Sequence, residues 1–217
     1  MCIRDSGYLL FEHLANAGIT CRGKLSERAL DINWHFEKFA EYQTPIADCL
    51  ERCNKNSLGL AAEALVKTIA AQSQEGKEGS WRLGTELISK YLGGLGVPRE
   101  EFYIDDGSGL SRKNRLSPNA ITKVLYSVYK SGNWKLYRSS LAVGGVDGTI
   151  RKYFKETAYK GRILGKTGYI DGVKSFSGVC AGKNGNYLFS IIANGANART
   201  RPVINDIAKA ILDEADK

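Results

Sequence analysis

A lysine, a threonine and a glycine stand together in the last third of the sequence, at Lys166, Thr167 and Gly168. They lie within RILGKTGYIDGVKSFSGV, residues 162–179. A lysine at the start of a strand can hold a carboxylate or transfer a proton, and a threonine hydroxyl can bind the same anion. Glycine lets a substrate backbone lie against the strand, and the Tyr169 N–H could donate to an oxyanion. The tripeptide therefore predicts part of an acyl-transfer site, which also needs a nucleophile.

Helices must surround such a strand, and the sequence supplies helical patterns before it. Residues 57–70 and 80–96 carry apolar residues at helical spacing, and the polar segment 71–80 between them is the best candidate for a loop. A serine followed by a proline begins a third predicted helix, 117–129. These three segments are therefore predicted to be helical.

The last third changes from helical to strand periodicity. Segments 175–182 and 187–195 predict two strands joined by a tight turn at Asn184 and Gly185. A helix begun by Pro202 follows, and one face of it is apolar: Val203, Ile204, Ile207, Ala208, Ile211 and Leu212. The tripeptide is predicted to begin a strand at the edge of an antiparallel sheet that this helix covers. The expected fold class is α/β, of the α+β kind.

Composition limits the kinds of protein this can be. The 217 residues are 43% hydrophobic, enough for one good core, and no apolar run is long enough to cross a bilayer. The start, MCIRDS, matches no readable pattern or export signal, and a helical segment follows at once. We expect a truncated reading frame whose first six or so residues are not native.

Charge and metal-binding residues point to no further partner. The net charge is +8, but the basic residues are spread along the chain, which favours a solvated surface over a nucleic-acid groove. Cys49 and Cys53 lie one helical turn apart, yet His13 and His35 lack ligand spacing, so no metal site is expected. The five cysteines form no disulfide framework, and their redox state stays open. With two unplaced histidines, a Ser-His-Asp triad is also disfavoured.

Together with the tripeptide, four segments resemble a known family: residues 53–65, 102–118, 142–154 and 161–178. The chain is similar to the low-molecular-mass (class C) penicillin-binding proteins of the D-alanyl-D-alanine carboxypeptidase/endopeptidase type, peptidase family S13, from about residue 10 to its end. The resemblance implies a serine β-lactamase/transpeptidase-like fold and an acyl-serine mechanism without a cofactor. It also implies peptidoglycan stem peptides and β-lactams as ligands, and a periplasmic or other extracytoplasmic location.

The family carries three motifs in order, Ser-x-x-Lys, Ser-x-Asn and Lys-Thr-Gly. The third is complete here, and Ser57 occupies the second at a separation similar to the family's. The resemblance implies that Ser57 relays a proton to the departing D-alanine nitrogen, while Lys166 and Thr167 hold the substrate carboxylate. Gly59 stands where the family has Asn, so the amide that would bind the substrate carbonyl is missing.

No Ser-x-x-Lys precedes Ser57. The single match in the chain, Ser127 to Lys130, comes after the second motif and is expected to lie on a helix surface. We therefore expect the nucleophile upstream in a longer protein, exposed apolar surface, and no activity of this chain alone. Residues 1–40 would be the tail of an inserted domain, and residues 41–217 the C-terminal part of the transpeptidase-like domain.

Two other interpretations stay open. The absent first motif and Gly59 fit a catalytically dead relative that binds peptidoglycan peptides, whereas a serine β-lactamase on the same fold would need a deacylating base that no residue after Ser57 obviously supplies. The acidic segment with Asp105, Asp106 and Ser108 is expected to form a structural loop. Residues 144–148 are likewise expected to form a loop, since no P-loop motif is complete there.

Overall fold

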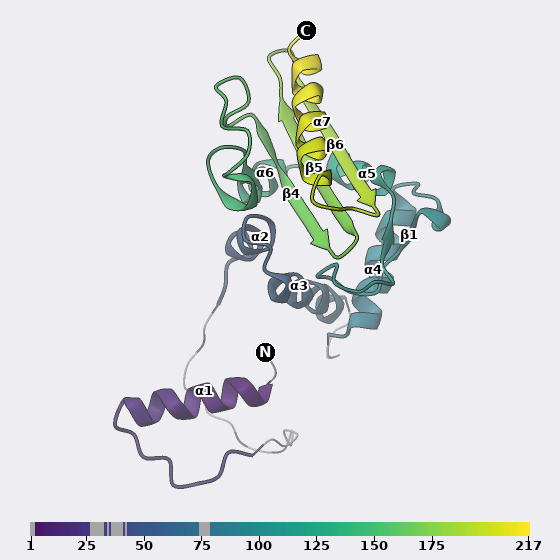
Figure 1. Ribbon diagram of the computed structural model, residues 1–217. Helices are drawn as coiled ribbons and strands as arrows, with labels where there is room; N and C mark the ends of the chain where they lie inside the picture. The colour runs from purple at the N-terminus through teal and green to yellow at the C-terminus, as the bar shows by residue number, and fades with distance from the viewer. Residues whose placement is uncertain (1–2, 27–32, 34, 36–40, 42, 74–78) are drawn as a thin grey trace. The chain divides into compact units, whose positions relative to one another are not determined.

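The computed structural model describes residues 3–26, 33, 35, 41, 43–73 and 79–217. The chain divides into two parts, Met1–Gln43 and Thr44–Lys217. The first part contains helix α1 (Ile3–Asn16), and every other described element belongs to the second (Figure 1). The assignment of residues 1–40 to an inserted domain stays a prediction, since most of residues 27–42 lie outside the described part.

The second part is a mixed helix and strand structure. Its helices, among the described residues, are α2 (Ile46–Asn54), α3 (Gly59–Gln72), α4 (Trp81–Gly94), α5 (Pro118–Tyr129), α6 (Trp134–Ser140) and α7 (Thr200–Ala215), with short 3-10 turns η1 (Arg99–Glu101) and η2 (Gly148–Ile150). Its strands are β1 (Phe102–Tyr103), β2 (Arg115–Leu116), β3 (Ala142–Val143), β4 (Ile163–Ile170), β5 (Val173–Ala181) and β6 (Asn186–Asn194). β1 pairs with β2, and the larger sheet has the antiparallel order β3-β4-β5-β6.

The Lys-Thr-Gly tripeptide lies in the second half of β4. The expectation that Lys166 begins a strand is wrong, because the strand already begins at Ile163, where apolar side chains fill both faces of the sheet. β3 pairs only with Leu164 and Gly165, whereas β5 pairs with β4 along its whole length. From Lys166 onward, the outer edge of β4 therefore has no strand partner in the described part of the chain, as the prediction of an edge position requires.

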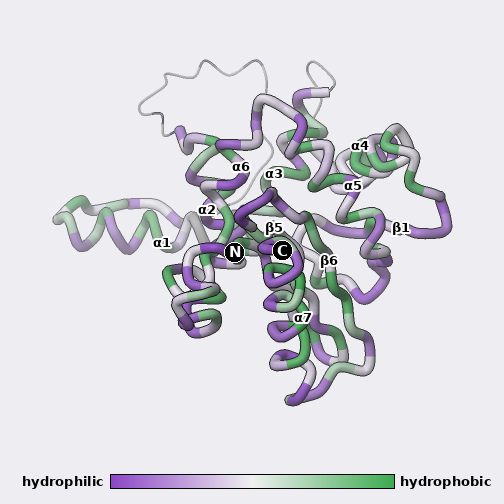
Figure 2. Tube along the Cα trace, turned by 90° about the horizontal axis from the view of Figure 1, so that it is seen from above, coloured by the Kyte–Doolittle hydropathy of each residue, from purple (hydrophilic) through white to green (hydrophobic). Residues whose placement is uncertain are grey.

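Helices cover both faces of this sheet (Figure 1). Successive residues of a strand point to opposite faces, and the neighbours Ile163 and Leu164 belong to different buried clusters. Ile163 packs in the cluster that includes Ile204 and Leu212 of α7, whereas Leu164 packs with Leu141 beside α6. Figure 2 shows many hydrophobic residues along β6 and an alternation of hydrophobic and hydrophilic residues along α7, as expected for a helix with one face on the sheet. The expected covering helix is thus confirmed.

Most local predictions agree with the structure. The helices expected at 80–96 and 117–129 form as α4 and α5, and the Ser117 hydroxyl caps α5 by accepting from the Ala120 N–H at 2.9 Å. The β5–β6 turn lies at residues 182–185 as expected. Two boundaries differ, because α3 begins at Gly59, leaving Ser57 in the preceding turn, and α7 begins at Thr200, before Pro202. Residues 74–78 of the expected loop lie outside the described part.

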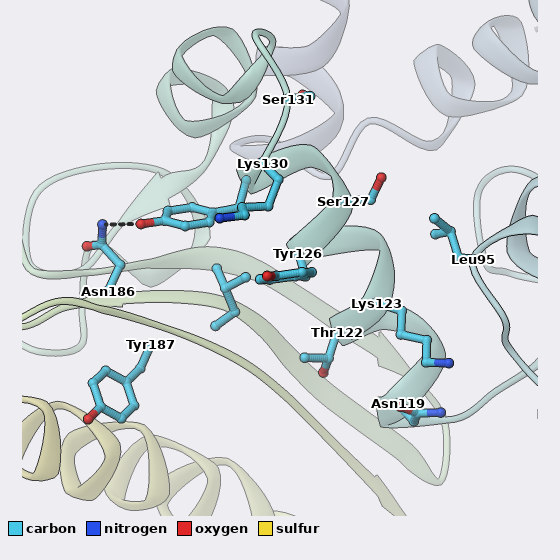
Figure 3. A pocket seen from close by; sticks show the side chains of 12 residues that line it. Leu95, Asn119, Thr122, Lys123, Tyr126, Ser127, Lys130, Ser131, Asn186 and Tyr187 are labelled. Atoms are coloured by element: carbon cyan, nitrogen blue, oxygen red, sulfur yellow. Dashed lines mark hydrogen bonds between the residues drawn. The ribbon is translucent and has the colours of Figure 1, made fainter.

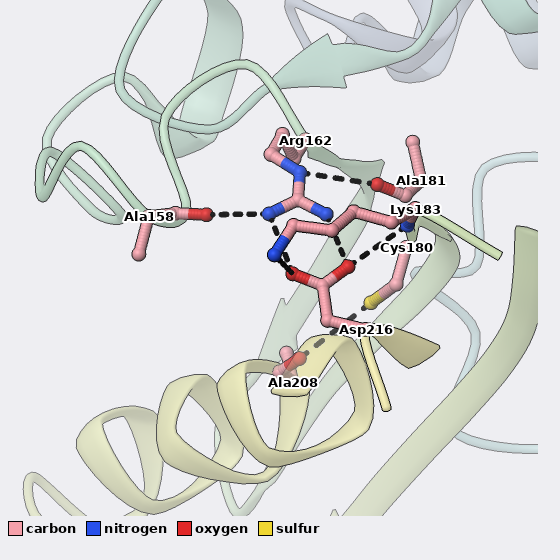
Figure 4. Close-up of polar contacts among 7 residues, drawn as sticks. All are labelled: Ala158, Arg162, Cys180, Ala181, Lys183, Ala208 and Asp216. Atoms are coloured by element: carbon pink, nitrogen blue, oxygen red, sulfur yellow. Dashed lines mark hydrogen bonds and ion pairs between the residues drawn. The ribbon is translucent and has the colours of Figure 1, made fainter. Parts of the chain in front are cut away.

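An ion pair ties the end of α7 to the start of β4 (Figure 4). The Arg162 guanidinium donates to both carboxylate oxygens of Asp216, at 2.9 and 2.5 Å, and also to the carbonyls of Ala158 and Ala181. Bonding to Arg162, helped by the Lys183 N–H, lowers the pKa of Asp216 to about 2. Arg162 thus fixes the covering helix beside the strand that carries the tripeptide.

Candidate active site

The structure brings Ser57 and Lys166 together. The Lys166 ammonium donates a hydrogen bond to the Ser57 hydroxyl and another to the backbone oxygen of Thr167, at 2.5 Å. Ser57 is exposed at the junction of α2 and α3, and Lys166 is half-buried on β4. Two residues chosen from separate sequence motifs therefore share one open site.

The backbone of Ser57 is held in an uncommon conformation. Its φ is 55°, in the left-handed region that non-glycine residues seldom occupy. The residue after Ser57 is bonded back to α2, because the Leu58 N–H donates to the Arg52 carbonyl at 3.0 Å. Such conformations persist only where the surroundings impose them, and they are common at functional sites. The strained turn aims the Ser57 hydroxyl at Lys166.

The surroundings of Lys166 lower its pKa from the ordinary value of a lysine. Burial lowers the pKa of Lys166, the positive charge of Arg201 lowers it further, and the Cys53 thiol acts in the opposite sense. The Arg201 guanidinium lies at the start of α7 and donates to the carbonyls of Gly168 and Ser175, both at 3.2 Å. A lysine with a lowered pKa is better able to exchange a proton near neutral pH.

Thr167, Gly168 and Tyr169 occupy the open side of β4. The Thr167 hydroxyl donates to the Thr149 hydroxyl at 3.0 Å. A side chain at Gly168 would collide with the Ser175 hydroxyl, so the glycine has a packing reason of its own. The Tyr169 side chain is 69% exposed, and its backbone lies beyond the last β3 pairing. The role of its N–H as an oxyanion donor stays a prediction.

Gly59, which the family resemblance predicts to replace an asparagine, is the first residue of α3. A Cβ placed there would lie 3.2 Å from the Ser108 Cβ, a close contact. Ser108 belongs to the loop 105–111, which Glu63 of α3 holds by accepting from the N–H groups of Gly107 and Ser108 at 3.1 and 2.9 Å. The loop therefore forms a wall beside the place where an asparagine side chain would begin.

The acidic loop behaves as the sequence interpretation expects. The Asp106 carboxylate accepts from the N–H groups of Gly109 and Ser111, both at 2.7 Å, and from the Asn114 amide. Burial alone would raise the pKa of Asp106, but these hydrogen bonds outweigh it, and the pKa lies below its usual value. Asp106 is thus engaged in holding its own loop rather than in acid–base chemistry.

The Ser-x-x-Lys match lies elsewhere, on α5. The Ser127 hydroxyl pairs with the Tyr91 hydroxyl at 3.0 Å, and the Lys130 ammonium lies 5.9 Å from the centre of the Tyr126 ring. Both residues line a cavity of about 870 Å³ between α5 and the start of β6, shown in Figure 3. That cavity contains none of the residues predicted for the site.

Three further residues join the site that sequence interpretation did not single out: Thr149, Arg201 and Glu63. Each lies in a loop or helix far along the chain from the residue it contacts, and only the fold brings them together. Glu63 and Thr149 fall inside segments that carry the family resemblance, which is the one signal that could have found them. Among the described residues, no cluster of three or more metal-ligating side chains is present.

The chain is similar in sequence to carboxypeptidases of one known family. The model of the D-Ala-D-Ala carboxypeptidase 3 (S13) family matches residues 4–215. The D-alanyl-D-alanine carboxypeptidase of Actinomadura sp. (strain R39) is 29% identical over 216 residues, 96% of this chain and 40% of the relative. The penicillin-sensitive carboxypeptidase A of Dictyostelium discoideum is 28% identical over 187 residues, 82% of this chain and 35% of the relative.

The fold of this chain is similar to that of a solved structure. Penicillin-binding protein 4 (dacB) from Haemophilus influenzae, complexed with a novel β-lactam, aligns with a TM-score of 0.75 and 22% identity over 98% of this chain and 51% of that one. The transpeptidase-like fold expected from the sequence is confirmed. The chain spans less than half the length of the two curated relatives, at 40% and 35%. Since the family model covers nearly all of its residues, the chain belongs to the D-Ala-D-Ala carboxypeptidase 3 (S13) family.

Proposed function

We propose that this chain is part of a serine-type D-Ala-D-Ala carboxypeptidase/endopeptidase, the part that relays the proton and binds the substrate carboxylate. The observation that carries the proposal is the hydrogen bond from the Lys166 ammonium to the Ser57 hydroxyl. It joins the second and third motifs of the family in one site. The lowered pKa of Lys166, caused first by burial, supports a role in proton exchange.

In this proposal the nucleophile is a Ser-x-x-Lys serine from an upstream segment of a longer protein. Its hydroxyl proton passes to the lysine of the same motif while its oxygen attacks the carbonyl carbon of the D-Ala-D-Ala bond. The C–N bond breaks, an acyl-serine ester forms, and the proton on that lysine is the one that Ser57 relays. Ser57 passes a proton to the departing D-alanine nitrogen, and water later hydrolyses the ester. Lys166 and Thr167 hold the terminal carboxylate of the substrate.

The proposed ligands are peptidoglycan stem peptides and β-lactams, which present a carboxylate beside a reactive carbonyl. Lys166 and Arg201 supply positive charge at this end of β4, and the open edge from Lys166 to Ile170 leaves room for an extended peptide. We place the reaction outside the cytoplasm, in the periplasm or its equivalent, because the cell-wall substrate is located there. No described helix is long and apolar enough to span a membrane.

A second candidate is a relative that binds such peptides without cleaving them. Gly59 favours it, because a glycine at this position supplies no side-chain amide to bind the substrate carbonyl. Removing one preorganised donor typically lowers the rate by a factor on the order of 10² to 10³. A β-lactamase on the same fold is the third candidate, and it would hydrolyse the acyl-enzyme and release ring-opened penicillin instead of retaining it as an adduct.

The test is covalent labelling with a fluorescent penicillin, followed by denaturing electrophoresis. The purified chain, its Ser57→Ala and Ser127→Ala variants, and a longer protein containing the upstream segment are compared. We expect no band from the folded chain and a persistent band from the longer protein. Loss of that band on changing the upstream serine would identify the nucleophile.

Other outcomes separate the candidates. A band from the short chain that disappears in Ser127→Ala would make Ser127 the nucleophile and overturn the proposal. A band lost only in Ser57→Ala would make Ser57 the acylated residue rather than the relay. Turnover of penicillin by the longer protein would indicate a β-lactamase. Binding of a muropeptide without any adduct would identify a non-catalytic relative.

A further inference from the structure

The turn at Asp147, Gly148 and Thr149 contacts both halves of the candidate site. The sequence pattern alone assigns these residues to an ordinary glycine-containing loop. In the structure they form the start of η2, which lies between the end of α2 and β4. Each of the three residues makes a different contact.

Asp147 holds the end of α2, directly before the Ser57 turn. Its carboxylate forms an ion pair with the Lys55 ammonium at 2.8 Å, and Lys55 is the second residue before Ser57. The Lys55 side chain is only 18% exposed, so water screens this pair less than a surface pair. Hydrogen bonding to Asp147 is the main cause that raises the pKa of Lys55. A neighbouring contact, from the Asn54 amide to the buried Ser140 hydroxyl at 2.8 Å, fixes the same end of the helix.

The other carboxylate oxygen of Asp147 connects this ion pair to the sheet. It accepts from the Val143 N–H of β3 at 2.7 Å. Val143 pairs with Leu164 of β4, two residues before Lys166. A single carboxylate therefore links the α2 end that precedes Ser57 to the strand that carries Lys166.

Gly148 allows the two segments to approach this closely. Its φ is +60°, and an added Cβ would lie 2.5 Å from the Ala142 Cβ and 3.1 Å from the Lys55 carbonyl oxygen. A side chain at this position would push the turn away from both β3 and α2. Gly148 is therefore needed because it lets the turn lie close to Ala142 and Lys55, not because it makes the loop flexible.

Thr149 reaches the third motif itself. Its hydroxyl accepts from the Thr167 hydroxyl at 3.0 Å and lies exposed, beyond the point where β3 stops pairing with β4. A hydroxyl bonded in this way has a fixed orientation. Thr149 therefore sets the direction of the Thr167 hydroxyl, next to Lys166.

We propose that Asp147 and Thr149 are positioning residues, which hold the Ser57 turn and the Lys-Thr-Gly strand at the separation that lets Lys166 contact Ser57. The inference rests on the proposed function, because it concerns the same pair of residues. In this proposal, neither residue contacts the reacting atoms. Asp147 acts through Lys55 on Ser57, and Thr149 acts through Thr167.

The test measures how readily Lys166 reacts with an amine-acylating reagent as a function of pH, by peptide mass spectrometry on the full 217-residue chain. The charged and titratable groups that face Lys166 are Cys53 of α2 and Arg201 of α7, and neither is altered. The exposed Lys113 in the same samples corrects for reagent loss. Asp147→Asn and Thr149→Val are compared with the unmodified chain.

We expect the midpoint of Lys166 labelling to move to higher pH in both variants. Burial is the main cause of the lowered pKa of Lys166, and a site that loses its support admits water. Thr149→Ser retains the hydroxyl and should keep the original profile. Glu156→Gln is the matched control for Asp147→Asn, because it removes the ion pair with Lys209, at 2.6 Å, which does not involve the site.

Folded variants whose profiles superimpose on that of the unmodified chain would overturn the proposal, even if their stability were lower. Should Asp147→Asn fail to fold, the exposed Thr149→Val decides the question alone. Ser57→Ala separates this inference from the proposed function. A profile changed by Ser57→Ala but by neither of the two variants refutes only the positioning role. A profile unchanged by Ser57→Ala as well means that Lys166 and Ser57 are not in contact, and both proposals fail.

Discussion

Ser57 and Lys166 are 109 positions apart in the chain, and the Lys166 ammonium donates a hydrogen bond to the Ser57 hydroxyl. The serine lies in the turn between α2 and α3, and the lysine lies on an unpaired stretch of the β4 edge. Helices α7 and α6 cover the two faces of the sheet that carries Lys166, whereas the turn that carries Ser57 is exposed. Several elements of the second part of the chain therefore hold the pair in place.

Ser57 is expected to reduce the stability of the chain through its backbone. A non-glycine residue in the left-handed region costs roughly 1 kcal/mol, so Ser57→Gly should be more stable to urea than Ser57→Ala by about that amount. Ser73 is the matched control, because its φ is −77° and the order of Gly and Ala should reverse there. Equal stability of the two Ser57 variants would contradict the strained turn.

Lys166 should make stability depend on pH in the alkaline range. Its pKa in the folded chain is lowered from 10.5 by burial and by Arg201, so the unfolded chain binds more protons between the lowered value and 10.5. Stability contributed by this group therefore rises as pH rises through that window. In Lys166→Met the rise should be smaller, as measured by urea unfolding at several pH values. Parallel curves for the two proteins would argue against a lowered pKa.

Asp216 should make stability depend on pH in acid. Its folded pKa is about 2, lowered from 3.8 by Arg162 first, so its contribution is present above 3.8 and is lost as pH falls toward 2. Asp216→Asn should lower the thermal midpoint at neutral pH and flatten its decline in acid. Asp171→Asn is the control, because that carboxylate is 92% exposed and its ion pair with Arg112 is long, at 3.8 Å. An equal effect of both substitutions would refute the special role of the Arg162 pair.

The cysteines should differ sharply in reactivity. Cys180 is fully buried, its thiol faces the Ala208 carbonyl, and burial raises its pKa to about 12. A disulfide reagent at neutral pH should leave Cys180 unmodified until the chain unfolds, whereas the half-buried Cys49 reacts in the folded chain. Peptide mapping by mass spectrometry measures how far each cysteine has been labelled. Rapid labelling of Cys180 under native conditions would mean that α7 does not stay on the sheet.

If Gly59 replaces the family's asparagine as proposed, an asparagine at this position should improve acylation in the proposed longer protein. Gly59→Asn adds the missing amide, and because its Cβ would lie 3.2 Å from the Ser108 Cβ, the change is best combined with Ser108→Gly. We expect penicillin acylation to accelerate by a factor on the order of 10². Ser108→Gly alone is the control for altered loop packing. An unchanged acylation rate would show that this protein binds the substrate carbonyl without a side-chain amide.

Local patterns in the sequence were sufficient for most of the elements. Apolar spacing located α4 and α5, the Ser-Pro pair located the start of α5, and Asn184 with Gly185 located the turn between β5 and β6. These predictions succeeded because helix caps and tight turns depend on nearby residues. The start of β4 was missed because Ile163 and Leu164 look like any short apolar run until both faces of the sheet are known.

The sequence by itself determined the motif residues, the order of the elements that it predicted, and the family. Only the tertiary structure decided that the Lys166 ammonium meets the Ser57 hydroxyl, that Arg201 bonds the Gly168 carbonyl, and that Thr149 pairs with Thr167. It also decided that Asp147 connects Lys55 to Val143. The physical reason is that local periodicity specifies which face of an element is apolar, whereas contacts between distant side chains depend on how those faces pack against one another.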